Sequence, residues 1–159
     1  GGAGDVTTFA ATAKGSTLLG AGATFKFVAG DSAVKNGATG AFTAATAFDA
    51  TVTDTITGFD AATWAAGAGA KFTIDTDVTA TTKNFGTSLT FGTTAVDQAG
   101  GFFILDNNAT EASTAYVFQD SNGNSKIDAT DLMIKLVGSA QLADAEFAVS
   151  SGNLVFTSA

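Results

Sequence analysis

The amino-acid sequence predicts an all-β fold, either a β-sandwich or a β-roll-like stack of roughly nine or ten short strands. Several segments alternate apolar and polar residues with a period of two, which is typical of strands that bury one face. Gly, Asn, Asp and Ser cluster between these segments, as turns require. The third observation is composition, because Gly, Ala and Thr dominate the chain and 14 Phe supply aromatic side chains for a core.

Each expected strand rests on such an alternation or on a short apolar run between turn residues. In the strand near residue 26, Phe25 and Phe27 lie on one face. A turn is expected at Asn36-Gly37. Residues 41–50 fit either a strand or a helical turn, and residues 141–147 fit one short helical turn. The other expected strands cover residues 5–10, 51–59, 71–78, 89–96, 101–105, 115–118, 132–137, 147–149 and 154–156.

We expect one domain spanning residues 1–159, because no linker longer than a loop interrupts the series of short strands. Residues 1–28 look like degenerate β-roll turns, and residues 29–159 form the calcium-binding sandwich portion. Two Gly-rich fragments, residues 1–6 and 19–25, resemble eroded copies of the nonapeptide G-G-x-G-x-D-x-U-x. The aspartate is one place early in the first copy and absent from the second, which favours turns without metal.

Charge and residue usage exclude several classes of function. The chain has a net charge of −8, from 15 acidic residues and seven Lys with no Arg, so nucleic acid is not an expected partner. It has no Cys and no His, which excludes disulfides, thiolate metal sites, His-ligated zinc and imidazole general-base chemistry. No reaction class can be assigned to named residues, so the chain is not expected to be an enzyme. No apolar run is long enough for a transmembrane helix.

Residues 120–131 have the oxygen-ligand spacing of a calcium loop of the EF-hand type. Position 7 needs to offer only its backbone carbonyl, and Ile127 at position 8 is the usual apolar anchor. Two features weaken the match: Ser125 replaces the usual Gly at position 6, and position 12 is Asp instead of the longer Glu. The alternative is a plain polar turn. Positions 1, 3, 5, 7, 9 and 12 hold Asp120, Asn122, Asn124, Lys126, Asp128 and Asp131.

The segments on either side of this loop predict strands, since residues 115–118 are apolar and residues 132–137 alternate. A calcium sensor places its loop between helices that open and close. Here the loop joins two strands. Bound Ca²⁺ would therefore clamp a hairpin and stabilise the fold without switching it.

Further candidate ligands and partners follow from single residues. Asp54 lies on the apolar face of the strand at 51–59, and with Asp60 it could bind a second cation; the alternative is a strand-end carboxylate in water. Trp64 and Tyr116 could stack on a cell-surface polysaccharide, although a lone Trp is more often a core or interface residue. Residues 106–111 form an acidic loop. Asn108-Ala109-Thr110 within it fits the N-glycosylation tripeptide, but so short a match predicts nothing by itself.

The order of four segments resembles the C-terminal region of repeats-in-toxin (RTX) proteins, which bacteria export by type I secretion. Residues 19–27 are similar to a last roll turn and its strand, and residues 54–75 to the family's Asp-x-Ile-x-Asp-Phe segment and its following strand, with Gly58 in place of an Asp. Residues 116–138 resemble its strand, calcium turn and strand, and residues 142–147 its closing turn. The resemblance implies an extracellular or cell-surface bacterial protein that folds on meeting external Ca²⁺.

We therefore expect a calcium-stabilised structural protein that self-assembles into a surface layer, sheath or filament. The alternative is a C-terminal secretion and folding module of a larger type I-secreted hydrolase or adhesin, because the same region occurs on such proteins. In the first case the N-terminal strand would pair with a sheet edge of a neighbouring copy. That candidate assembly strand comprises Asp5, Val6, Thr7, Thr8, Phe9 and Ala10.

Overall fold

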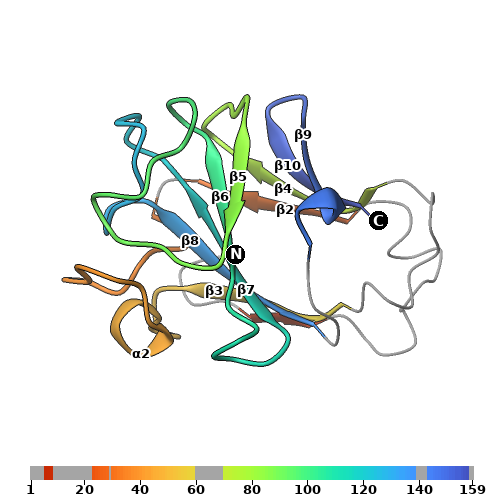
Figure 1. Ribbon diagram of the computed structural model, residues 1–159. Coiled ribbons are helices and arrows are strands. Elements are labelled where there is room, and N and C mark those ends of the chain that lie inside the picture. The colour runs from red at the N-terminus through yellow and green to blue at the C-terminus, as the bar shows by residue number, and fades with distance from the viewer. Residues whose placement is uncertain (1–5, 9–22, 29, 60–69, 139–142, 158–159) are drawn as a thin grey trace.

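The structure is a computed structural model that describes residues 6–8, 23–28, 30–59, 70–138 and 143–157. Within these residues the fold is all-β, as predicted, and ten strands form two sheets that face each other as a sandwich (Figure 1). The strands are β1 (Val6–Thr8), β2 (Ala23–Phe27), β3 (Asp54–Phe59), β4 (Ala70–Thr76), β5 (Lys83–Gly86), β6 (Phe102–Asp106), β7 (Thr114–Gln119), β8 (Leu132–Gly138), β9 (Phe147–Ser150) and β10 (Asn153–Thr157).

The larger sheet has six strands in the order β1-β3-β8-β7-β6-β5. Its centre is an antiparallel meander, in which β7 pairs with β6 on one side and with β8 on the other. The outer strands join in parallel, β3 along β8, β1 along β3 and β5 along β6. Strands β6 and β7 are buried along their whole length, and for that reason they read as continuous apolar runs in the sequence.

The smaller sheet has four strands in the order β2-β4-β10-β9. Strands β9 and β10 form the predicted closing hairpin, with Leu154 opposite Val149. Strand β10 continues antiparallel to β4, and β2 lies parallel to β4 at the edge. The expected helical turn before the hairpin is a short 3-10 helix, η3 (Asp144–Glu146).

An apolar core fills the space between the two sheets. Phe72 from β4 stacks on Phe156 from β10, with ring centroids 5.0 Å apart, and Phe25 from β2 meets Phe72 edge-on at 5.9 Å. The larger sheet contributes the side chains on the inner faces of β3, β6, β7 and β8. This core buries, among others, Ile56, Ile74, Phe102, Ile104, Val117, Ile134, Leu136, Phe147 and Leu154.

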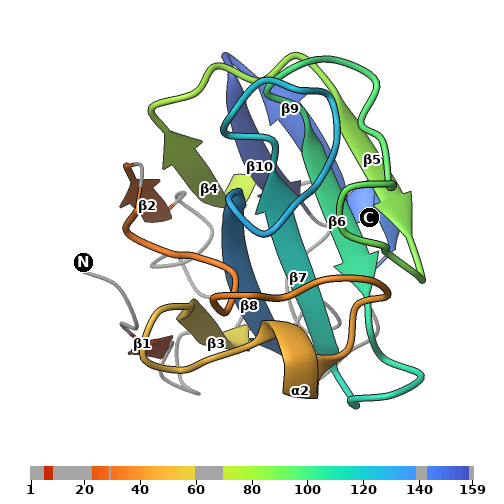
Figure 2. The ribbon, with the colours of Figure 1, turned by 90° about the vertical axis from the view of Figure 1, so that its left-hand side faces the viewer.

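A second core lies on the outer face of the larger sheet. Figure 2 shows the chain before β3, with helix α2 (Ala44–Ala47), crossing in front of β7 and β8. The side chain of Thr43 caps this helix by accepting the N–H of Thr46 at 3.2 Å. Residues 41–50 thus resolve as a helical turn. Between the sheet and two covering segments, this chain and residues 87–100, the second core buries Val34, Ala47, Leu89, Phe91, Val96, Phe103, Tyr116, Phe118, Ile127 and Met133.

The expected strand at residues 89–96 is wrong. Gly92 has φ +75°, and the N–H groups of Thr93 and Thr94 both bond to the carbonyl of Thr90, so the chain turns there. Its apolar side chains are buried because the loop covers the sheet, not because it is a strand. The nearby strand β5 was not predicted, since Phe85 is its one apolar side chain. None of the described helices is long and apolar enough to cross a membrane.

We expect Phe72→Ala to destabilise the protein by about 3–5 kcal/mol, because it removes a ring packed between two others and leaves a cavity. Thr73→Ala, a half-buried neighbour on the same strand whose side chain points away from this core, serves as the matched control and should change the free energy of unfolding by less than about 0.5 kcal/mol. Urea denaturation measures both. Similar losses for the two variants would show that the sheets do not pack through Phe72.

Candidate functional site

The predicted calcium loop joins β7 to β8, which form the expected antiparallel hairpin with Gln119 opposite Leu132. It lies at the end of this hairpin remote from α2 (Figure 2). Strand β7 is buried along its whole length, and β8 over its first three residues. The loop is therefore attached to a deeply buried part of the larger sheet.

The first ligand position, Asp120, is fully buried and its carboxylate accepts four backbone N–H groups. Oδ1 accepts those of Gly123 at 2.9 Å and Asn124 at 3.1 Å. Oδ2 accepts those of Ser125 at 2.8 Å and Gly100 at 3.1 Å. These bonds curl the loop around the carboxylate and tie it to the segment before β6.

Ser125 occupies the position where calcium loops usually have Gly, and it adopts the same left-handed conformation, with φ +62°. The sequence mismatch therefore does not prevent the sharp turn. Two residues on, Ile127 is fully buried in the outer core. Its N–H donates to Thr94 O at 2.9 Å, and its carbonyl accepts from Gly92 N at 2.8 Å. The predicted apolar anchor is thus confirmed.

The exposed part of the loop is closed by hydrogen bonds on Asp128. One oxygen accepts the N–H and hydroxyl of Thr130, and the other accepts the amides of Asn122 at 3.0 Å and Asn124 at 2.8 Å. Burial alone would raise the pKa of Asp128, but these donors outweigh it, first those of Thr130, and lower the pKa to about 2. Asp128 is therefore ionised at neutral pH.

The last ligand position, Asp131, is 1% exposed. Its carboxylate accepts the N–H of Ser121 at 2.9 Å and the N–H of Asp128 at 2.8 Å. Burial raises the pKa of Asp131 to about 6, and the negative charges of Asp128 and Asp120 add to that effect. Asp131 therefore keeps its proton to a higher pH than an ordinary Asp.

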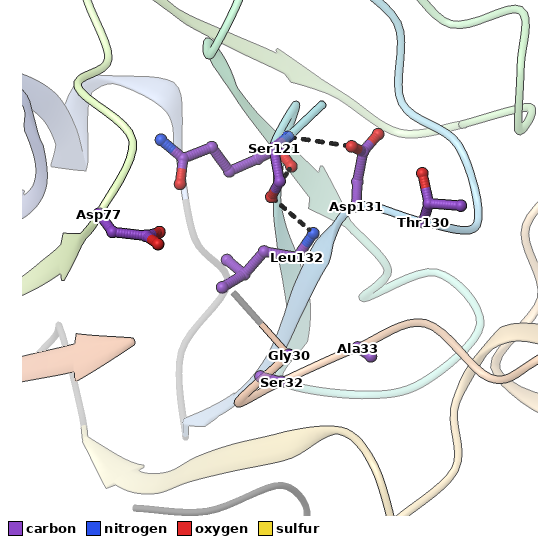
Figure 3. A pocket seen from close by; sticks show the side chains of 9 residues that line it. Gly30, Ser32, Ala33, Asp77, Ser121, Thr130, Asp131 and Leu132 are labelled. Carbon is purple, nitrogen blue, oxygen red and sulfur yellow. Dashed lines mark hydrogen bonds between the residues drawn. The ribbon is translucent and has the colours of Figure 1, made fainter. Parts of the chain in front are cut away.

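Figure 3 shows the surroundings of Asp131, which borders a small pocket of about 80 Å³. Ser121 links the two strand ends: its N–H donates to Asp131, and its hydroxyl accepts the N–H of Leu132 at 3.2 Å. Asp77, from the loop after β4, faces the same pocket. Ser121 was not predicted, because it lies between two ligand positions, where the spacing of calcium ligands assigns no role.

Cationic side chains pair elsewhere. Among the described residues, Lys26 pairs with Asp75, Lys83 with Asp144 and Lys135 with Glu111. None of these ion pairs reaches the three carboxylates of the loop. The loop, with three Asp and one Lys, therefore carries net negative charge that no ion pair among the described residues neutralises.

The donor set fits Ca²⁺ in its chemistry, because all the candidate ligands are oxygens. In the conformation described, however, these oxygens are bonded within the loop: Asn122 Oδ1 accepts from Asn124 N at 3.0 Å, and Asn124 Oδ1 from Lys126 N at 2.8 Å. Across the described residues, no three acidic side chains converge as a metal ion would require.

The structure places the other candidates as follows. Asp54 begins β3, is 5% exposed, and its N–H donates to Ser32 Oγ at 2.9 Å. Its proposed partner Asp60 lies outside the described residues, as does Trp64. Of the candidate assembly strand, Val6, Thr7 and Thr8 form β1 beside β3 of the same chain. Asp5, Phe9 and Ala10 lie outside the described residues.

Tyr116 cannot stack on a polysaccharide, because it is fully buried in the outer core. Its hydroxyl donates to Glu111 Oε2 at 2.8 Å, and Glu111 also accepts from Lys135. Burial raises the pKa of Tyr116, and the Glu111 carboxylate raises it further. Lys135 Nζ lies 4.6 Å from the centroid of the Phe48 ring. This cluster was not predicted; a Lys on an otherwise apolar strand was its one signal in the sequence.

Comparison with protein-family models finds no match for the chain, and a search of curated proteins finds no significant relative. The similarity to RTX proteins therefore stays an expectation drawn from the order of its segments.

We expect Ser125→Gly to stabilise the metal-free protein by about 1 kcal/mol, because glycine adopts a positive φ without the strain that a side chain brings. Gly123→Ser is the matched opposite change, at φ +74° in the same loop, and should destabilise it by a similar amount. Denaturant unfolding with chelator present measures both. Loss of stability in Ser125→Gly would mean that the serine side chain stabilises the loop by more than its backbone strain costs.

Proposed function

We propose that this protein is a calcium-stabilised extracellular structural protein that assembles with copies of itself into a surface layer, sheath or filament. The observation that carries the proposal is the loop of residues 120–131, whose three aspartates form no ion pair with a Lys among the described residues. A divalent cation would supply the missing charge, and its binding free energy would add directly to folding stability.

Six residues would hold the ion. Asp120 and Asp131 would bind from the buried base of the loop, and Asp128, Asn122 and Asn124 from its exposed side. Lys126 would offer its backbone carbonyl; its neighbours Ser125 and Ile127 make the bonds to the adjacent segment. The ion would neutralise the loop and fix β7 against β8. Nothing in this arrangement calls for catalysis, and we propose a non-catalytic role.

Strand β1 supports the assembly part of the proposal. It has three residues, pairs in parallel with β3, and stands at the end of the six-stranded sheet. Strand β3 is twice as long, so the described residues of β1 cover only part of its edge. A neighbouring copy could place the same residues in the same register, because exchange of an identical element preserves the native contacts.

The alternative is a secretion and folding module on a larger exported protein. A calcium-clamped hairpin suits that role equally well, since it would delay folding until the chain meets external Ca²⁺. The reading frame of the parent gene separates the two hypotheses. A catalytic domain upstream favours the module, whereas a stand-alone frame or repeated copies favour the building block.

We expect Ca²⁺ to raise the melting temperature, since a ligand at 100 times its Kd adds about 2.7 kcal/mol of stability. Chelator should reverse the effect, and electron microscopy should show polymers with Ca²⁺ and monomers with chelator. Asp128→Asn should reduce the calcium response. Asp97→Asn, which removes an exposed carboxylate outside the loop, is the matched control. Melting that ignores Ca²⁺ in the unsubstituted protein would overturn the proposal.

A second experiment tests whether β1 pairs with β3 of a neighbouring copy. The chain has no Cys, and Val6 and Thr55 are partners in register, so a Val6→Cys/Thr55→Cys variant can be cross-linked cleanly. After oxidation of assembled material, we expect a ladder of covalent multimers on a non-reducing gel. Val6→Cys alone should give dimers at most. Cross-linked monomer without multimers would show that β1 stays within its own chain.

A further inference from the structure

The turn between β6 and β7 carries the sequence Asp106-Asn107-Asn108-Ala109-Thr110. It lies at the opposite end of β7 from the calcium loop (Figure 2). Asn108-Ala109-Thr110 is the tripeptide Asn-x-Thr that accepts N-linked glycans. Of the seven Asn in the chain, Asn108 alone is followed two residues later by Ser or Thr.

The turn presents the correct one of two adjacent asparagines. Asn107 is 9% exposed, and its side-chain amide is directed at Glu111 Oε2, 3.4 Å away. Asn108 is only half-buried, and Ala109 and Thr110 after it are exposed. Thr110 is therefore accessible, and Asn108 is partly so.

Asp106 supplies a second observation. Its Oδ1 accepts the backbone N–H of Asn108 at 2.9 Å and the Asn108 side-chain amide at 2.5 Å. A carboxylate two residues before the acceptor would give a transferase a charge to pair with, and because Asp106 is 8% exposed, the enzyme would reach it only once the tip of the turn opens. A pattern that includes this Asp occurs by chance less often than the tripeptide alone.

The base of the turn is fixed, whereas its tip is held by local bonds. Glu111 is anchored by Lys135 and Tyr116. Burial opposes ionisation of Glu111, but the hydrogen bonds from Lys135 and then Tyr116 outweigh it and lower its pKa, so this anchor is charged at neutral pH. At the tip, the N–H groups of Thr110 and Glu111 bond to Asn107 O at 2.9 and 2.8 Å. Each such bond contributes about 1 kcal/mol net, so a transferase can open the tip without unfolding the sheet.

We propose that Asn108 is an N-glycosylation site whose donor is a polyprenyl-pyrophosphate-linked oligosaccharide. Asn108 Nδ2 attacks C1 of the first sugar, the C1–O bond to pyrophosphate breaks, and the polyprenyl pyrophosphate leaves with the bonding electron pair. One amide proton passes to a base of the transferase, and no oxidant or reductant is needed. The proposal rests on the export part of the proposed function, because such transfer takes place outside the cytoplasm; it needs neither Ca²⁺ nor assembly.

The test incubates the folded 159-residue chain with a purified bacterial oligosaccharyltransferase and a defined lipid-linked oligosaccharide. Intact-mass spectrometry should show the mass of one added glycan, and peptide mapping should place it on Asn108. Asn108→Gln and Thr110→Val should abolish the addition. Asp106→Asn, which keeps the side-chain size, should reduce it to background, whereas Asp106→Glu should retain it as the matched control.

Three outcomes would overturn the proposal: no transfer to the folded chain, transfer only after denaturation, or transfer that Asp106→Asn leaves unchanged. Circular dichroism of each variant separates loss of the acceptor from loss of the fold. Since the reaction needs no Ca²⁺, a chain that is glycosylated but indifferent to Ca²⁺ would reject the proposed calcium role and keep this one.

Discussion

The buried carboxylate of Asp120 is the interaction on which the calcium loop and its neighbouring segments depend. A charge removed from water is very unfavourable unless hydrogen bonds replace its hydration, and four backbone N–H groups do so here. Those groups come from two stretches of chain, so one side chain fixes the curl of residues 120–131 and the position of Gly100. The left-handed Ser125 and the inward Ile127 follow from that curl.

The strands that could be predicted are those whose sequence pattern and burial agree. Residues 132–137 alternate and form β8, and the apolar run at 101–105 largely forms β6. Residues 89–96 share this apolar character but are buried as a cover over the sheet, because a pattern reports burial and not hydrogen bonding. Strand β5 shows the converse: an edge strand with one apolar side chain carries almost no signal in the sequence.

The candidate site, like the set of strands, could be predicted from the sequence only in part. Ligand spacing and strand alternation are local properties, so they located the loop, the anchor Ile127 and the joined strands. The direction of each oxygen depends on distant partners, such as Gly100 for Asp120, which no local pattern contains. Tyr116 was misjudged for a related reason, since its burial depends on Phe42, about 75 residues away, whose ring centroid lies 4.8 Å from its own.

The pairing of the sheets also sets an order for folding. Strands β6, β7 and β8, and likewise β9 and β10, are close in sequence and pair through hairpins, so their contacts close small loops. Strands β1 and β2 pair in parallel with partners some fifty residues further along, which loop-closure entropy makes slow. Because β1 and β2 pair, among the described strands, only with β3 and β4, which themselves join β8 and β10 about 80 residues further along, we expect the N-terminal strands to be incorporated last.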